Sequence, residues 1–270
     1  MDIIVCIKQV PDTRNVKLDP ETNTLRREGV ESIINPFDMY AVEAALRLKD
    51  QHGGTVTAIT MGPPQAAEAL RQVVEYGVDD VILLSDRAFA GADTWATSYT
   101  LARAIQKKGK FDLIVCGKQA SDGDTAQVGP GLAEQLDLPF VAFVQKIESL
   151  DPDAKTMTVQ RLMDDGHDRL ECPLPALITV VKEIGELRVP SLRGKMKAKK
   201  IEIPVMTAAD IDAAPESIGL KGSPTQVVEV FAPQPRGNRV SIEGSPDEMA
   251  EALFRHLTEA KVLSLGGDES

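Results

Sequence analysis

Short apolar runs alternate with helical patterns through the first half of the chain, and this alternation restricts the fold more than any other feature. The runs are rich in β-branched residues, which is typical of buried strands, and they lie at residues 3–7, 56–60, 81–84 and 113–116. Apolar residues recur at helical spacing over residues 38–50, 64–76 and 93–108. The alternation predicts an α/β fold, a Rossmann-like parallel sheet with helices on both faces.

The composition is that of an acidic protein with an aliphatic core. The 270 residues carry a net charge of −11 and include only 4% aromatic residues. Because a protein that binds a nucleic-acid backbone needs a basic surface, this charge argues against nucleic acid as a partner. The first residues read as a strand without the features of a signal peptide, and no apolar run is long enough to span a membrane. We therefore expect a cytoplasmic protein.

Two further segments interrupt or extend the alternation. Residues 9–34 contain two short strand patterns around a turn, which predicts a hairpin inserted after the first strand. Residues 139–182 read as β-rich, with strands expected at 140–147, 156–162 and 176–181.

The last third of the chain has a different character. From about Gly185 prolines interrupt the pattern, and a helical period returns only at residues 246–257. Such a segment cannot bury a core alone. We therefore expect a nucleotide-binding α/β domain over residues 1–184 and an extended C-terminal arm over residues 185–270 that packs on another chain.

The polar loop at residues 117–130 is the strongest functional signal. It follows the apolar run at 113–116 and leads into a helical pattern at 132–136. Backbone N–H groups and the positive end of a helix dipole then converge on one spot, which favours an anion such as phosphate. The loop matches neither the Walker pattern nor G-x-G-x-x-G. In a parallel sheet the loops after the strands share one edge, and ligands bind there.

Several segments occur together in an order that resembles one known family. They are residues 5–12 (VCIKQVPD), 35–38 (NPFD), 41–43 (AVE), 60–65 (TMGPPQ), 117–130 (GKQASDGDTAQVGP), 161–179 and 191–200 (SLRGKMKAKK). On these segments the chain resembles the β subunit of electron-transfer flavoproteins over essentially its whole length. The segments at 60–65 and 117–130, in that order, are the most specific part of the resemblance.

The resemblance implies a heterodimer in which an α subunit holds a redox-active FAD. In ordinary members the β subunit binds AMP, whereas in the electron-bifurcating members a second FAD occupies that site and NADH is the donor. This chain looks closer to the bifurcating members, because residues 86–98 resemble a segment that they share and Gly123 replaces a carboxylate of many ordinary members. The implied partners are the α subunit, an acyl-CoA dehydrogenase-type or other flavin dehydrogenase, and ferredoxin or flavodoxin.

The resemblance assigns a first group of residues to the adenylate part of the cofactor. Asn35 would hydrogen-bond the ribose or base, and Met61 would cover the adenine. The loop amides and the Thr125 hydroxyl would hold the phosphates, while the loop carboxylates cap the following helix. The group consists of Cys6, Asn35, Met61, Gly117, Lys118, Gln119, Ala120, Asp122, Gly123, Asp124, Thr125, Ala126 and Gln127. For Cys6, simple packing in the core is an equal alternative.

A second group opens the helical pattern at 93–108 and is expected on the flavin side of FAD. Thr94 and Thr97 lie one helical turn apart, so both hydroxyls can face one ligand. Gly91 and Asp93 precede them, and Asp93 suits a helix N-cap as well as it suits a ligand contact.

The resemblance places partner recognition at residues 191–200. Leu192 is a lone leucine in a polar stretch between prolines, as expected of an exposed apolar anchor. Lys195 and Lys197, with Lys199 and Lys200, form a basic run in an acidic protein. Such a run pairs with an acidic partner surface or is simply solvated.

Other classes of function stay open on the sequence. One is a β subunit that holds AMP structurally, one is a non-redox adenine-nucleotide sensor, and one is a nucleotide-hydrolysing or adenylating enzyme. The last needs a base and a metal-binding acid, and only the carboxylates at 122–124 are available. We find no catalytic set and no metal-ligand spacing; Cys6, Cys116 and Cys172 are far apart and read as reduced core thiols.

Overall fold

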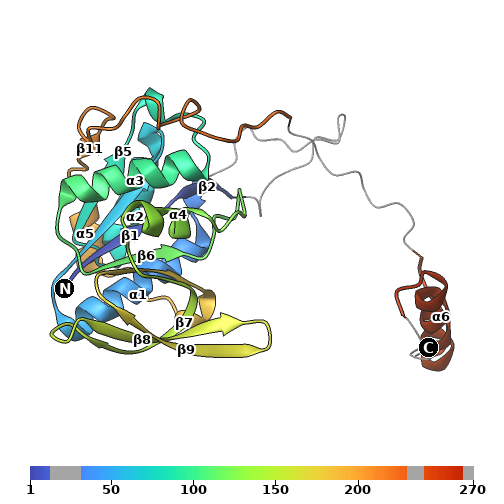
Figure 1. Ribbon diagram of the computed structural model, residues 1–270. Helices are drawn as coiled ribbons and strands as arrows, with labels where there is room; N and C mark the ends of the chain where they lie inside the picture. Colours follow the sequence, from blue (N-terminus) through green and yellow to red (C-terminus); the bar gives the residue numbers. More distant parts are fainter. Residues whose placement is uncertain (13–31, 230–239, 264–270) are drawn as a thin grey trace. The chain divides into compact units, whose positions relative to one another are not determined.

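The β-branched runs form the strands of one central sheet in the parts of the chain that the computed structural model describes, residues 1–12, 32–229 and 240–263. The strand order is β11-β5-β4-β1-β6-β10-β7-β8-β9 (Figure 1). The strands are β1 (Asp2–Cys6), β4 (Thr55–Met61), β5 (Asp80–Leu84), β6 (Leu113–Gly117), β7 (Phe140–Asp151), β8 (Thr156–Met163), β9 (Gly166–Pro173), β10 (Ala176–Val180) and β11 (Val205–Met206). From β11 to β7 all neighbours are parallel, and β8 and β9 continue the sheet antiparallel.

Helices cover both faces of this sheet (Figure 1). They are α1 (Pro36–His52), α2 (Ala67–Tyr76), α3 (Thr94–Lys108), α4 (Val128–Gln135) and α5 (Leu192–Ala198), with short 3-10 turns η2 (Pro64–Ala66), η3 (Arg87–Phe89) and η4 (Lys182–Ile184). One buried cluster joins the sheet to α1 and α2, and a second joins it to α3 and α4. The expected Rossmann-like α/β class is confirmed.

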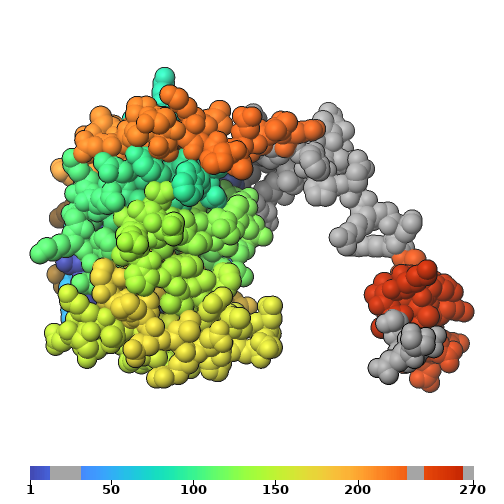
Figure 2. Space-filling model, viewed as in Figure 1, coloured from blue at the N-terminus to red at the C-terminus, as the bar shows by residue number. Residues whose placement is uncertain are grey.

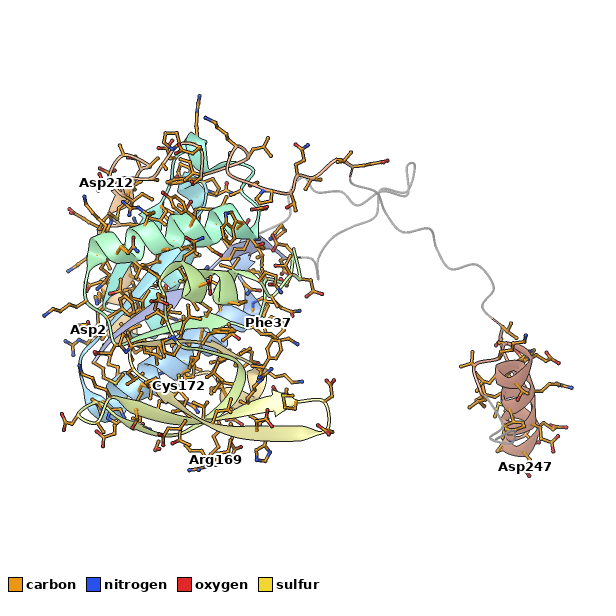
Figure 3. All side chains as sticks on the ribbon, viewed as in Figure 1. Asp2, Phe37, Arg169, Cys172, Asp212 and Asp247 are labelled. Carbon is orange, nitrogen blue, oxygen red and sulfur yellow. The ribbon has the colours of Figure 1, made fainter. Side chains whose placement is uncertain are left out.

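The order of the strands places a topological switch at β1. From β1 the chain moves through β4 to β5 on one side and then returns to form β6 on the other side of β1. Asp2, at the start of β1, and Phe37, in the first turn of α1, lie at opposite ends of the parallel strands (Figure 3). A crevice for a ligand is expected at the edge where the strands end, between the loops that follow β1 and β6.

The inserted hairpin is described only at its base. Strands β2 (Gln9–Pro11) and β3 (Ser32–Ile34) pair antiparallel, with Gln9 opposite Ile34. The two strand patterns expected within the insertion, at 16–18 and 25–27, lie outside the described residues.

The segment after β10 packs on the α/β domain rather than leaving it. The structure divides the chain into units Met1–Val228 and Glu229–Ser270, so the first unit ends later than the boundary expected at residue 184. Strand β11 pairs with β5, and Ile211 and Ile218 are buried against the α3 face. Figure 2 shows this segment, in orange, lying along the green residues of α3. These contacts link residues far apart in the sequence, so no local pattern announces them.

A buried carboxylate on α1 fixes the start of this segment. Glu43 accepts from Arg188 Nε at 2.8 Å and from Arg47 Nε at 2.7 Å. Burial alone would raise the pKa of Glu43, but the hydrogen bonds from the two arginines outweigh it and lower the pKa. Arg47 also donates to the carbonyl of Glu186 at 2.6 Å. The chain therefore leaves η4 along α1 before it reaches α5.

The second unit contains helix α6 (Pro246–Glu259), close to the helix expected at 246–257. Ser245 and Glu248 form a capping box at its start. None of its residues is buried, and Leu253 and Phe254 are about half exposed. An apolar helix face of this kind is stable only when something covers it. Among the described residues, no helix combines the length and the apolar character that crossing a membrane requires.

We predict that Gly194→Ala destabilises the protein, because α5 packs on α2 at this residue. A Cβ at Gly194 would lie only 2.1 Å from the backbone oxygen of Glu75, so α5 would have to shift. We expect a loss of about 1–3 kcal/mol in the free energy of unfolding, measured by urea denaturation. Gly123→Ala is the control, since its Cβ would meet nothing within 4 Å. Equal stability of the two variants would contradict this packing.

Candidate functional site

The loop between β6 and α4 has the backbone form of an anion site. Asp124 and Ala126 adopt left-handed conformations, with φ of 53° and 55°. Conformations of this kind, alternating with ordinary ones, turn neighbouring N–H groups toward one side of the chain. The N–H of Asp124 donates to the carbonyl of Ala120 at 2.8 Å, which closes the loop on itself. Residues 121–125 are exposed, so the loop surface is open to a ligand.

Asn35 hydrogen-bonds the backbone of this loop through both its amide nitrogen and its amide oxygen. Its Nδ2 donates to the carbonyl of Gln119 at 2.7 Å, and its Oδ1 accepts from the N–H of Ser121 at 3.0 Å. The same Nδ2 donates to Asp38 Oδ1 at 2.9 Å. Asn35 is only 1% exposed. Its amide is therefore committed to the loop and to Asp38, and it fixes the backbone of the loop.

Asp38, which the sequence reasoning did not single out, is the centre of this arrangement. Its carboxylate accepts from the N–H of Lys8 at 2.7 Å, from Asn35 and from the N–H of Gly117. A Cβ at Gly117 would lie 2.4 Å from Asp38 Oδ1, so only glycine permits this approach. Burial raises the pKa of Asp38 to about 7, although the hydrogen bonds and the Lys8 charge oppose the rise.

The loop carboxylates do not cap α4, so that expectation is wrong. Asp122 instead pairs with Lys8 Nζ at 2.7 Å, and Asp124 accepts from Gln119 Nε2. The residue before α4, Gln127, makes no side-chain cap hydrogen bond. The N–H groups of the first turn of α4 are therefore left for another acceptor, which the expected phosphate would supply.

The start of α3 lies beside the start of α4. Ser98 Oγ donates to the carbonyl of Val128 at 3.2 Å, and a Cβ at Gly131 would meet Ser98 Oγ at 2.7 Å. Thr94 and Thr97 are half-buried in the first turn of α3. They therefore lie close to the open end of α4, as the second group of expected cofactor residues requires.

Asp93 acts as the N-cap of α3, the structural alternative named above. Its Oδ1 accepts from the N–H groups of Trp95 and Ala96, each at 3.0 Å. Its Oδ2 accepts from the N–H of Thr225 at 3.0 Å and from its hydroxyl at 2.9 Å. Burial alone would raise the pKa of Asp93, but these hydrogen bonds hold it below its usual range. Gly91, which lies shortly before the start of α3, adopts φ 75° and packs beside Leu220.

Cys6 is the last residue of β1 and Met61 is the last residue of β4, so both lie where the parallel strands end. Cys6 is 8% exposed and is the register partner of Cys116 on β6. Hydrogen bonding with Cys6 and burial raise the pKa of the Cys116 thiol well above its usual value. The two thiols, like Cys172, are reduced and buried, so packing explains their places. Met61 is half-buried at the end of β4.

The expected partner residues differ from one another in exposure and contacts. Leu192 is 78% exposed as the first residue of α5, which Ser191 caps. Lys195 is exposed, whereas Lys197 Nζ donates to the carbonyls of Val78 at 3.2 Å and Asp79 at 2.8 Å. Lys197 therefore fastens α5 to the domain, and Leu192 and Lys195 remain the more accessible candidates.

Sequence reasoning passed over Lys8, Asp38 and Thr179. Lys8 and Asp38 lie inside segments that were recognised, and the acidic residue three positions after Asn35, at a helix start, was a usable signal. Thr179 lies within β10 and inside the recognised segment 161–179, but no local pattern marked it, because its role depends on which strands become neighbours. Among the residues that the structure describes, no cluster of three or more His, Cys, Asp or Glu side chains is suited to a metal ion.

The fold and the site define a Rossmann-like α/β protein with a glycine-containing loop and an uncapped helix at the topological switch. Residues 22–211 match the electron transfer flavoprotein domain, and the chain belongs to the electron transfer flavoprotein family, among its beta subunits. The resemblance inferred from the sequence is thereby confirmed.

Three similar proteins illustrate this placement. The caffeyl-CoA reductase-Etf complex subunit CarD of Acetobacterium woodii is 49% identical over 97% of this chain and 100% of its own. Protein FixA of Azotobacter vinelandii is 48% identical over 95% of this chain and 94% of its own. An electron transfer flavoprotein subunit beta of Thermoanaerobacterium thermosaccharolyticum is 46% identical over 97% of this chain and 100% of its own.

We predict a pH-dependent stability that is due to Asp38. Because its pKa in the folded protein, about 7, lies above the value of 3.8 for an exposed Asp, the folded state keeps a proton that the unfolded state releases between about pH 4 and 7. The free energy of unfolding should therefore fall as the pH rises through this range, by up to about 1.4 kcal/mol per pH unit, and then level off.

Urea denaturation of the wild type and of Asp38→Asn at several pH values measures this effect. The difference between the two curves should carry the slope, since the asparagine cannot titrate. Asp79→Asn removes a carboxylate that accepts from Val56 N–H at the opposite edge, and it should leave the slope in place. A wild-type slope that survives in Asp38→Asn would contradict the assignment.

Proposed function

We propose that this chain is the β subunit of a heterodimeric electron-transfer flavoprotein and that it binds FAD in the crevice between the loops after β1 and β6. In this proposal electrons from NADH pass to a flavin dehydrogenase and to a low-potential carrier such as ferredoxin or flavodoxin. The observation that carries the proposal is the uncapped first turn of α4 beneath a loop with two left-handed residues.

The residues of the crevice fit a dinucleotide. The loop from Gly117 to Gln127 and the start of α4 offer amides to phosphate groups. Met61 offers a polarizable side chain at the adenine end. Thr94 and Thr97, at the start of α3, offer hydroxyls farther along the crevice, in the direction that a longer ligand than AMP would take.

Bound flavin supplies the redox chemistry, since it accepts a hydride and releases electrons singly. The protein's own part is to bind and orient. Asn35 and Asp38 fix the loop amides, and Asp93 fixes the first turn of α3. The thiols of Cys6 and Cys116 are buried at the ends of β1 and β6, and the surroundings of Cys116 raise the pKa of its thiol and so disfavour its thiolate.

The partners in this proposal bind outside the crevice. The α subunit covers the C-terminal arm, including the apolar face of α6, which has no buried residue of its own. The dehydrogenase receives the exposed Leu192, with Lys195 beside it and Lys197 completing the basic run. One relative is named as a subunit of a caffeyl-CoA reductase-Etf complex, which supports a reductase or dehydrogenase partner of the acyl-CoA dehydrogenase type.

The second candidate is an ordinary β subunit that holds AMP structurally, while only the α-subunit FAD carries electrons. It uses the same loop but not Thr94 and Thr97. A non-redox nucleotide sensor is the candidate of another class. The family membership counts against it.

The cofactor content of the purified heterodimer tests the proposal. We expect two FAD per heterodimer after co-expression with the α subunit, measured by absorbance and by chromatography of the extracted cofactors. One FAD with one AMP would establish the second candidate instead. A colourless single chain that binds adenine nucleotides would contradict both.

We also predict that Thr94→Ala combined with Thr97→Ala weakens FAD binding at this site and spares AMP. Each lost hydroxyl hydrogen bond is worth about 0.5–1.5 kcal/mol, so the FAD dissociation constant should rise about tenfold. Thr125→Ala, in the phosphate loop, is the matched control and should weaken both ligands. Unchanged FAD affinity in the double variant would remove Thr94 and Thr97 from the site.

A further inference from the structure

Lys118 carries a charge that no carboxylate neutralises in the described part of the chain. Its Nζ lies 5.2 Å from the centre of the Phe143 ring. Its backbone N–H donates to the carbonyl of Val180 at 2.9 Å, which fixes the start of the loop against β10. Lys8, which follows β1, is instead paired with Asp122. The positive charge of Lys118 is therefore held in place but not compensated.

Phe143 is held in a strained conformation. Its φ of 58° lies in the left-handed region, which bulky residues rarely adopt. The pairing of β7 with β10 shifts register at this point, between Ile178 and Val180. The N–H of Phe143 donates to Thr179 Oγ1 at 3.1 Å. The bulge and this hydrogen bond turn the ring out of the regular strand and toward the loop after β6.

Thr179 brings this pair to the start of α4. A Cβ built on Gly129, in the first turn of α4, would lie 2.5 Å from Thr179 Cγ2. Thr179 therefore touches α4 on one side and holds Phe143 on the other. The positive end of the α4 dipole and the Lys118 ammonium lie in the same neighbourhood, and like charges repel. An anion between them would satisfy both.

We propose that Phe143 is a positioning residue, which holds the Lys118 ammonium beside the first turn of α4 so that Lys118 contacts the phosphate of the bound adenine nucleotide. The ring attracts the cation through its negative face. It accepts no ordinary hydrogen bond, so the three ammonium donors stay available to the phosphate. This inference rests on the proposed function, since it assumes an adenylate in the crevice.

The test compares AMP with adenosine, which lacks the phosphate. The full chain, co-purified with its α subunit and stripped of nucleotide, is titrated with each ligand by calorimetry. Lys118→Gln should weaken AMP binding about tenfold, because it removes a charge-assisted contact. Phe143→Leu should weaken it about threefold to tenfold. Adenosine affinity should change by less than about twofold in both variants, which a general disturbance of the crevice would not allow.

A double-mutant cycle tests whether Phe143 acts through Lys118. The variant with both substitutions should bind AMP as Lys118→Gln does, since the ring has nothing left to position. Phe143→Tyr keeps the ring and should retain wild-type affinity. Unchanged AMP affinity in Phe143→Leu, additive losses in the double variant, or an equal loss of adenosine binding would each overturn the proposal. If the wild type binds neither of these ligands and no FAD, the proposed function itself fails, and this inference fails with it.

Discussion

One buried carboxylate, that of Asp38, joins the chain after β1, the start of α1 and the loop after β6. Asp38 accepts from the backbone of Lys8 after β1 and of Gly117 at the end of β6, and through Asn35 it reaches Gln119 and Ser121 in the loop. A buried charge is stable only when donors surround it. The same donors therefore cannot move independently, and the loop backbone is fixed before any ligand arrives. Preorganised amides bind an anion without paying to order the loop.

The two helices that begin at this edge are finished in opposite ways. The start of α3 is closed by Asp93, whereas the start of α4 has no side-chain cap. Glycines let α4 approach its neighbours, with Gly129 against Thr179 and Gly131 against Ser98. The first N–H groups of α4 therefore lack a side-chain acceptor, whereas those of the adjacent α3 have one in Asp93. Under the proposed function, the anionic part of the ligand would lie at the start of α4 and a neutral part beside α3.

The sequence predicted what depends on local patterns. The strands around the switch point and the helices after them follow from β-branched runs and helical periods, and the loop at 117–130 follows from its position between them. It did not reveal the placement of residues 185–228, because Glu43, Arg188 and Ile211 make their contacts across the fold. It also assigned the loop carboxylates to a cap that Lys8 and Gln119 prevent. An aromatic residue at positive φ, as at Phe143, has no local signature at all.

The long-range contact of Asp93 connects the crevice to the route of the C-terminal chain. One carboxylate oxygen caps α3, whose first turn carries Thr94 and Thr97, and the other holds Thr225, shortly before the first unit ends at Val228. A displacement of Thr225 must therefore disturb the cap of α3. Asp93 therefore couples the order of the first turn of α3 to the position of the chain at Thr225.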